Sequence, residues 1–354
     1  MSENIRFPKP NWHVIRPRFL PLSFRIDRRA PIAIVGLLIA ICVVLVLSVS
    51  YGEYNISPAD VVRAVFGIET SDPNHELVVR SFRLPRILLS LLVGMSLGAS
   101  GAIMQGLTRN DLADPGLLGI NTGAGVVVVS YLVFAPNAGL SALPWLAFAG
   151  ALAASFFIYT LAWKGGVSPL RLILIGVGLA ALGGAAINFL ITRLEVFQAQ
   201  RAFVWLTGSV YGSTWEEVQL MLVWIIVLMP ITLLSARQLN LLGLGDGLAA
   251  GLGVRVEMQR LLLIVLSAGL ASITVTVAGT IGFVGFVAPH IAQRLVGPSH
   301  EGLLFGTLFT GGLLMVTADL LSRWVISPSE LPIGVTTAII GAPYFGYLLY
   351  QKGK

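Results

Sequence analysis

The amino-acid sequence predicts an all-α integral membrane protein with about ten transmembrane helices. Hydrophobic residues make up 56% of the 354 residues, and charged residues only 11%, whereas a soluble domain usually carries about 25% charged residues. The charges are also clustered, and the apolar runs between the clusters are long enough to cross a bilayer. This composition excludes a soluble globular protein of this size.

Residues 1–30 form a basic tail ahead of the first apolar run. Because that run can span a bilayer and carries no small-x-small cleavage site, we expect a retained first helix and not a cleaved signal peptide. The tail supplies most of the formal net charge of +6. Orientation in a membrane explains this excess, so no nucleic-acid partner is expected. The basic residues of the tail are Arg6, Lys9, Arg16, Arg18, Arg25, Arg28 and Arg29.

Ten apolar runs of bilayer-crossing length follow the tail. The seventh and eighth are nearly continuous, and we divide them at 279–282 because the undivided run is too long for one crossing. Ser57, Asp114 and Ser168 each precede a proline, a pattern typical of a capped helix start. The predicted spans are 31–50, 86–107, 115–134, 142–163, 169–192, 218–235, 260–279, 280–296, 302–321 and 332–350.

The placement of lysine and arginine predicts the orientation of these spans. With the N-terminus on the cytoplasmic side, 16 of the 23 Lys and Arg residues fall on that side and the remaining 7 on the other. Such an excess marks cytoplasmic segments, so both termini are expected to be cytoplasmic. We expect residues 31–354 to form a single transmembrane domain.

Internal sequence similarity predicts an inverted repeat. Residues 175–183 in the fifth span and 333–341 in the tenth share five of nine identities. Spans two to five would then correspond to spans seven to ten, and a shift of five spans turns the second copy upside down. Inverted repeats are a transporter architecture, with the pathway near the repeat interface. A weaker similarity aligns Arg86 with Arg260 and Pro115 with Pro289, two pairs related by the same shift in residue number.

The cytoplasmic segment of about residues 237–259, between spans six and seven, is too long for a tight connection. Asp246 is expected to cap a short helix over 248–250, which Gly251 and Gly253 then end. Small apolar residues flanked by arginine predict a docking site for another protein. The alternative interpretation is a solvated loop.

The polar residues inside the spans are few. Asp319 is the best candidate for a functional acid, and Arg323 lies one turn later on the same helix face, which predicts an interfacial ion pair. His290 shares its span with no second His, Cys or carboxylate, so a structural role is favoured over a ligand role. The chain also has no G-x-x-x-x-G-K-[ST] motif, so nucleotide-driven action would need a separate subunit.

Three outer arginines, Arg80, Arg83 and Arg86, precede the second span. Positive charge at a helix N-terminus is unfavourable to the helix dipole, so these side chains need another explanation. Binding of an acidic partner is one interpretation, and local pairing with Glu76 or Asp72 is the other.

Several motifs in one order resemble the FecCD-type permeases, the membrane subunits of bacterial ABC importers for ferric siderophores, haem and cobalamin. Arg83-Leu84-Pro85-Arg86 precedes LLVGMSLGASGAIMQGLTRNDLADPGLLGINTGAG, and GLGVRVEMQR, GTIGFVGFVAPHIAQRLVG and SELPIGVTTAIIGAP follow. The resemblance covers the chain from about Tyr51 onward, and the basic tail is its main departure. The segments LAWKGGVSPLRLILIGVG and LLGLGDGLAAGLGV are more similar to the ferric-siderophore members than to the cobalamin members.

The resemblance implies a set of partners. These are a second permease subunit, identical or homologous, two cytoplasmic ATPases that hold ATP and Mg, and an extracytoplasmic substrate-binding protein. The expected cargo is a ferric siderophore crossing the bacterial cytoplasmic membrane, and the protein is surrounded by membrane lipid. The chain itself is expected to bind no cofactor and no metal and to be no enzyme.

The resemblance also implies three groups of site residues. The ATPase-coupling residues are Asp246, Gly251, Leu252, Gly253, Val254 and Arg255. The residues that dock the binding protein are Arg83, Arg86 and Arg323. The residues expected along the translocation pathway are Asn188, Arg193, Thr336 and Thr337.

Two other classes of function stay open on the residues alone. An ion-coupled secondary transporter would use Asp319 or His290 and would run without an ATPase. A membrane-embedded enzyme would need His, Asp or Glu clustered at one membrane face, and the sequence shows no such cluster.

Overall fold

The computed structural model describes residues 12–15, 24–52, 56–135, 139–326 and 329–352. Each of the ten predicted spans coincides with a helix. Eight helices in these described ranges are long and apolar enough to cross a membrane, while α5 and α13, with 15 and 13 residues, are shorter. The ten helices are α1 (Ala30–Ser50), α4 (Leu84–Thr108), α5 (Ile120–Phe134), α6 (Leu143–Ala162), α7 (Pro169–Ile191), α9 (Trp215–Leu234), α12 (Val256–Ala278), α13 (Val284–Val296), α14 (His300–Trp324) and α15 (Ile333–Lys352).

Shorter elements connect these helices. Ser57 and Asp114 cap the segments after them, as predicted, but the side chain of Ser168 makes no capping hydrogen bond. The predicted division at 279–282 is confirmed, because α12 ends at Ala278 and α13 begins at Val284. The connecting elements are α2 (Pro58–Phe66), α3 (Asn74–Leu77), the π-helix η1 (Val78–Arg83), the 3-10 helices η2 (Pro115–Leu118) and η3 (Leu140–Ala142), α8 (Val196–Thr207), α10 (Ala236–Gly243) and α11 (Asp246–Gly251).

The basic tail contains two strands that the all-α prediction missed. β1 (Trp12–Ile15) pairs antiparallel with β2 (Phe24–Asp27). The residues of β2 alternate between apolar and charged, which is the strand pattern, but a run of four is too short to identify from sequence. Residues 1–11 and 16–23 of the tail lie outside the described ranges.

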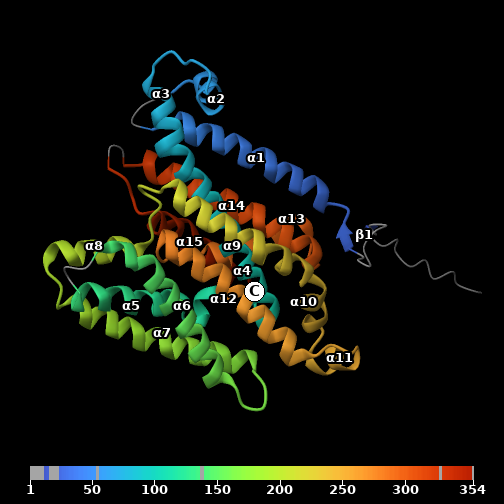
Figure 1. The fold of residues 1–354 in the computed structure, drawn as a ribbon. Coiled ribbons are helices and arrows are strands. Elements are labelled where there is room, and N and C mark those ends of the chain that lie inside the picture. The colour runs from blue at the N-terminus through green and yellow to red at the C-terminus, as the bar shows by residue number, and fades with distance from the viewer. Residues whose placement is uncertain (1–11, 16–23, 53–55, 136–138, 327–328, 353–354) are drawn as a thin grey trace, which may run out of the picture.

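Helix α4 is the centre of the bundle (Figure 1). It continues α3 and η1, and 83% of the most apolar stretch of residues 74–108 is buried, against α14, α12, α13 and α9. Glycine allows the closest of these contacts. A Cβ atom at Gly94 would overlap the backbone of Gly311, and one at Gly101 would overlap that of Gly285, as in other tightly packed membrane helices.

The two predicted repeats have the same packing. In the first, α5 contacts α6 and α7, and in the second, α13 contacts α14 and α15. The first helices of the two copies, α4 and α12, run antiparallel, since Ser96 donates to the carbonyl of Leu270 while Ser100 donates to that of Ser267. Equivalent helices that point in opposite directions are the expected geometry of an inverted repeat.

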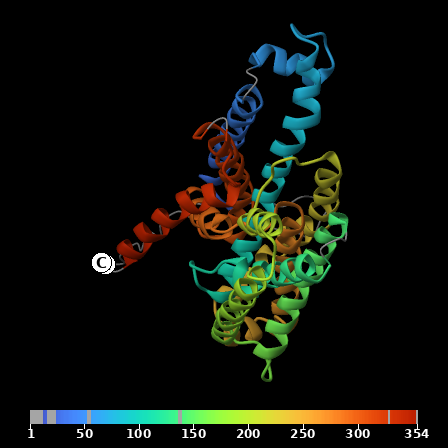
Figure 2. The same ribbon diagram turned by 90° about the vertical axis from the view of Figure 1, so that its left-hand side faces the viewer.

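Helices α7 and α15, the fifth and tenth spans, are poorly covered. Only 11% of the most apolar stretch of α7 and 28% of that of α15 are buried. Figure 2 shows α15 extending away from the rest of the bundle toward the C-terminus. In a membrane, lipid or another chain must cover these faces.

Candidate functional site

Helix α11 lies in the middle of the predicted cytoplasmic segment, beside α10 (Figure 1). It begins after Gly245 and is followed by Gly253, and both glycines have a positive φ, 108° and 84°, that side chains rarely adopt. Leu248 and Leu252 are 65% and 63% exposed. Of the predicted coupling residues, Asp246, Gly251, Leu252, Gly253 and Arg255 are exposed and Val254 is half-buried.

The predicted capping role of Asp246 is wrong. Asp246 is the first residue of α11, and its side chain makes no capping hydrogen bond. Its carboxylate instead lies between two guanidinium groups, 2.5 Å from Arg109 Nη2 and 2.9 Å from Arg260 Nη2. Arg260 also pairs with Glu257, at 2.7 Å. The charges of two arginines outweigh the weaker attraction of the backbone N–H groups at a helix start.

We call Arg109, Asp246, Glu257 and Arg260 the inner arginine cluster. Burial alone would raise the pKa of Asp246, but hydrogen bonds and charge from Arg260 and Arg109 outweigh it and hold the pKa below its usual value. Arg109 follows the last residue of α4, has φ 51°, and donates to the carbonyl of Leu242 at 3.0 Å. Asp246 therefore ties α11 to the end of α4 and to the start of α12, the first helices of the two repeats.

A second cluster lies at the opposite end of α4. Arg86 in the first turn of α4 pairs with Asp319 of α14 and with Glu330, both at 2.8 Å. The predicted pair of Asp319 with Arg323 is confirmed, at 3.1 Å. Arg83 donates to the carbonyl of Val49. We call Arg83, Arg86, Asp319, Arg323 and Glu330 the outer arginine cluster.

A hollow of about 520 Å³ is lined by every member of this cluster except Asp319, and also by Tyr211. Arg86 is 9% exposed and Asp319 fully buried, so the arginines are recessed. Local pairing, the alternative interpretation of these arginines, is found for Arg80, which binds Glu76 at 2.8 Å.

A widened helical turn lies shortly before Arg86 and ends at Arg83, the two residues by which this part of the chain enters the outer arginine cluster. The π-helix η1 ends at Arg83, directly before Leu84 and Pro85. Proline has no backbone N–H to donate and its ring crowds the preceding turn, so a wider turn relieves that crowding. Such turns are frequent at functional sites.

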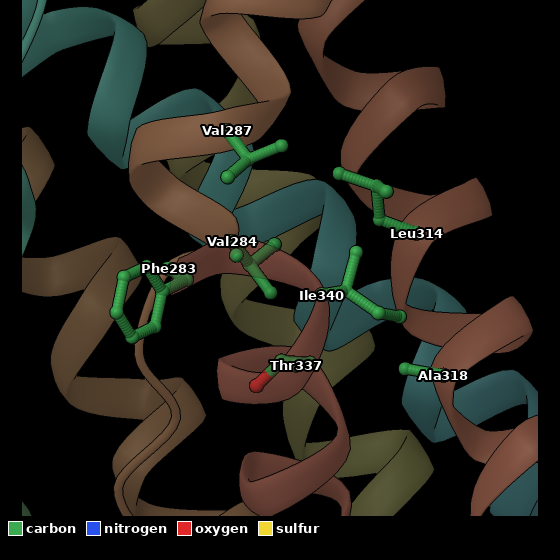
Figure 3. Close-up of a pocket in the computed structure, with 8 residues that line it drawn as sticks. Phe283, Val284, Val287, Leu314, Ala318, Thr337 and Ile340 are labelled. Atoms are coloured by element: carbon green, nitrogen blue, oxygen red, sulfur yellow. The ribbon is translucent and has the colours of Figure 1, made fainter. Parts of the chain in front are cut away.

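The predicted pathway residues fall into two groups. Asn188 is exposed on α7, and Arg193, beyond the end of α7, is exposed with its guanidinium 5.3 Å from the ring of Phe189. Thr336 and Thr337 are buried in the first turn of α15, 6% and 5% exposed. In Figure 3, Thr337 lies beside a small apolar pocket lined by Phe283, Val284, Val287, Leu314, Ala318 and Ile340.

The break between α12 and α13 joins three elements at one junction. Ser209, after α8, donates its N–H to the carbonyl of Ala278 at 2.8 Å, and the N–H of Gly334 donates to the carbonyl of Gly208 at 3.3 Å. A Cβ atom on Gly334 would overlap the carbonyl of Thr207. The end of α8, the end of α12 and the start of α15 therefore meet backbone to backbone.

Comparison with known proteins decides what kind of membrane protein carries these clusters. The model of the FecCD transport family matches residues 37–351 of this chain. The chain belongs to the FecCD transport family. The predicted cytoplasmic segment 237–259, both arginine clusters and the junction of α8, α12 and α15 all lie within the matched residues.

Relatives from two bacteria align along nearly their whole length. The iron(3+)-hydroxamate import system permease protein FhuG of Bacillus subtilis is 43% identical over 318 residues, 88% of this chain and 94% of FhuG. The achromobactin transport system permease protein CbrC of Dickeya dadantii is 42% identical over 317 residues, 89% of this chain and 90% of CbrC.

A solved structure has the same fold. An ABC transporter assigned to the metal-chelate type, in an inward-facing conformation, superposes with a TM-score of 0.81 and is 32% identical. The match covers 91% of this chain and 99% of that chain. This FecCD-family chain is therefore a multi-pass membrane protein with the fold of an ABC-transporter subunit.

Sequence reasoning missed the partners of the arginines in the two clusters of this FecCD-family chain. Arg86 pairs with Asp319 across 233 positions, and Arg109 pairs with Asp246 across 137. The alignment of Arg86 with Arg260 in the two repeats is the sequence signal that could have pointed to these pairs. Both arginines are buried at the start of the first helix of a repeat.

Proposed function

We propose that this chain is the permease subunit of an ABC importer that moves a ferric siderophore across the cytoplasmic membrane. One observation carries the proposal: a single buried helix, α4, joins the two arginine clusters. Arg86 lies in its first turn and Arg109 follows its last residue. Its 25 residues span about 37 Å, enough to cross a hydrocarbon core of about 30 Å.

At the inner end, the exposed helix α11 would dock a cytoplasmic ATPase. Leu248 and Leu252 offer largely exposed apolar side chains, and Asp246 holds the helix to the bundle. The residues of the contact are Asp246, Gly251, Leu252, Gly253, Val254 and Arg255. ATP and Mg would belong to the ATPase, whose motion would shift the permease between its states.

At the outer end, the outer arginine cluster would receive an acidic residue of the substrate-binding protein. Three arginines face two carboxylates, so the cluster keeps one net positive charge. A recessed positive site favours an acidic side chain that reaches into the hollow. Arg83 and Arg323 would make the contact, while Arg86 is held between Asp319 and Glu330.

The pathway would lie on the uncovered face of α7, closed by a second permease subunit. Exposed residues of α7 include Gly178, Ala181, Ala185 and Asn188, which are too small or too polar to suit lipid contact alone. A wall of small side chains would leave room for a bulky chelate. Relatives named for iron hydroxamate and for achromobactin support an iron chelate as the cargo.

The experiment compares the uptake of iron chelates by cells that carry this chain with the uptake by cells that lack it. Radiolabelled ferric hydroxamate, ferric citrate and hemin would be offered with and without the partner ATPase. We expect uptake of a ferric hydroxamate that requires ATP hydrolysis and survives collapse of the proton gradient. Uptake that needs no ATPase and stops with the gradient would support the ion-coupled alternative instead.

Asp319 is poorly suited to that alternative. An ion-coupled carrier needs an acid that can be exposed and neutralised during the cycle. The carboxylate of Asp319 is fully buried and paired with both Arg86 and Arg323. His290 packs against the ring of Tyr344, at 5.8 Å between centroids.

A further inference from the structure

Glu257, in the first turn of α12, joins two parts of the chain that are distant in sequence. Its Oε1 pairs with Arg260 at 2.7 Å, and its Oε2 accepts the backbone N–H of Val167 at 3.1 Å. Val167 belongs to the connection between α6 and α7. A side chain of α12 therefore holds the α6–α7 loop, residues 163–168.

The α6–α7 loop is built for this contact. Gly166 has φ 137°, a conformation that favours glycine, and a Cβ atom there would lie 2.9 Å from Glu257 Oε1, so a side chain would force the loop or the carboxylate to shift. Trp163 and Val167 form an antiparallel bridge that closes the loop. Arg171, in the first turn of α7, donates to the carbonyl of Gly166 at 3.3 Å. A displacement of the loop would thus pull on the start of α7.

On its other side, Glu257 connects to the coupling helix. Arg260 bridges Glu257 to Asp246, the first residue of α11. The side chain of Arg260 is 3% exposed, so burial limits its alternative positions. A chain of contacts therefore runs from α11 through Asp246, Arg260 and Glu257 to the N–H of Val167. Every contact in it involves at least one charged group, so these hydrogen bonds are stronger than neutral ones.

The mobility of the neighbouring helices decides which link carries motion. Asp246 also binds Arg109 at the end of α4, but α4 is the most buried of the long helices and cannot yield without disturbing the core. Helix α7 is the least buried of them and packs mainly on α5, α6 and η2. Motion that reaches the α6–α7 loop meets less resistance.

We propose that Glu257 is a positioning residue for transport, which passes the motion of α11 to α7 through Arg260 and the α6–α7 loop. This inference rests on the proposed docking of the ATPase at α11. A purely structural role explains Glu257 less well, because its side chain is 42% exposed and the buried Arg260 keeps its pair with Asp246 when Glu257 is removed.

The test follows α7 directly in the assembled complex. Cys42 is the only cysteine of the sequence, so Cys42→Ser gives a background for one spin label at Leu170→Cys, an exposed site in the first turn of α7. Spectra would be recorded in proteoliposomes with the ATPase, without nucleotide and with bound Mg-ATP. Substrate transported per ATP hydrolysed would be measured alongside.

We expect Glu257→Ala to reduce the ATP-dependent spectral change at position 170, and the transport per ATP, about threefold or more. Glu257→Gln should restore less than half of either, because its single amide oxygen can accept from Val167 or from Arg260 but its NH2 group cannot replace the second acceptor. Glu76→Gln removes an ion pair whose two side chains are both exposed, at the outer face, and should change neither. A full spectral change in assembled Glu257→Ala complex would overturn the inference.

Two further variants keep the test decisive. If Glu257→Ala fails to assemble, Gly166→Ala keeps the Glu257 carboxylate but forces it and the loop apart, since the new Cβ would lie 2.9 Å from Oε1, and the same loss is expected. An undiminished response in that variant would overturn the inference equally. Gly253→Arg tests the docking proposal itself. If this variant keeps the ATP-dependent spectral change at position 170, docking at α11 is wrong. If the change is lost in Gly253→Arg but kept in the Glu257 variants, only the relay through Glu257 is refuted.

Discussion

Arg86 of α4 and Asp319 of α14 form a 2.8 Å ion pair between residues 233 positions apart in the sequence. Asp319 is fully buried and also pairs with Arg323. The pair therefore holds together the two most closely packed helices of the bundle at their outer end, where the outer arginine cluster opens to the surface.

Removal of Asp319 should destabilise the protein strongly. Asp319→Ala leaves the buried guanidinium groups of Arg86 and Arg323 without their shared carboxylate, and breaking a buried pair usually costs about 3–5 kcal/mol. The free energy of unfolding in detergent measures this effect. Glu76→Gln is the control, since its pair with Arg80 is exposed. Equal stability of the two variants would contradict the account.

Close packing of α4 on α14 should make Gly94 intolerant of any side chain. A Cβ atom there overlaps the backbone of Gly311, so we expect Gly94→Ala to cost about 1–3 kcal/mol through overpacking. Gly36 of α1 has no atom within 4 Å of such a Cβ, and Gly36→Ala should be neutral or slightly stabilising. Thermal unfolding of both variants checks the difference, and a neutral Gly94→Ala would refute the observed contact.

Charge reversal in the outer arginine cluster should weaken docking of the binding protein. Arg83→Glu combined with Arg323→Glu replaces the attracting charge with a repelling one, and we expect about tenfold weaker binding at low salt. The difference should shrink as salt is raised. Arg63→Glu, whose arginine is 55% exposed and pairs with Asp60 outside the cluster, is the matched control. Docking that tolerates the double reversal would exclude this cluster as the contact.

Acidification should release α11 from the bundle. The pKa of Asp246 in the folded protein lies below its usual value, so the stability gained from its arginine pairs is complete above about pH 4 and is lost as the pH falls through the folded pKa. Hydrogen exchange of the α11 amides, corrected for intrinsic rates, should therefore rise at acidic pH. Asp246→Asn should exchange fast at every pH. Identical, pH-independent protection in both proteins would be inconsistent with the tether.

The helices could be predicted from the sequence because a membrane imposes simple constraints. Apolar run length located all ten helices within a few residues, and Gly279 to Gly282 located the break between α12 and α13. The apolar run predicted for α13 is longer than the helix, however, because residues 279–283 lie between α12 and α13 and are not helical.

The tertiary partners could not be predicted in the same way. The pair of Asp319 with Arg323 is local to one helix face and was predicted, whereas its pair with Arg86 depends on how α4 and α14 pack. Asp246 looked like a helix cap because capping is a local pattern, and the arginines that bind it lie on other helices. The burial of Thr336 and Thr337 likewise depends on how α15 packs against the rest of the bundle.

The most direct test of the central claim, that this chain is an ATP-driven permease operated through α11, is transport of ferric hydroxamate by the reconstituted complex carrying Gly253→Arg. Gly253 has φ 84° and open space around it, so the arginine would project at the docked ATPase. Gly253→Asn is the control, because asparagine tolerates a positive φ and is small. The account predicts that Gly253→Arg abolishes uptake while the ATPase still hydrolyses ATP and that Gly253→Asn transports normally. Undiminished uptake by Gly253→Arg would contradict it.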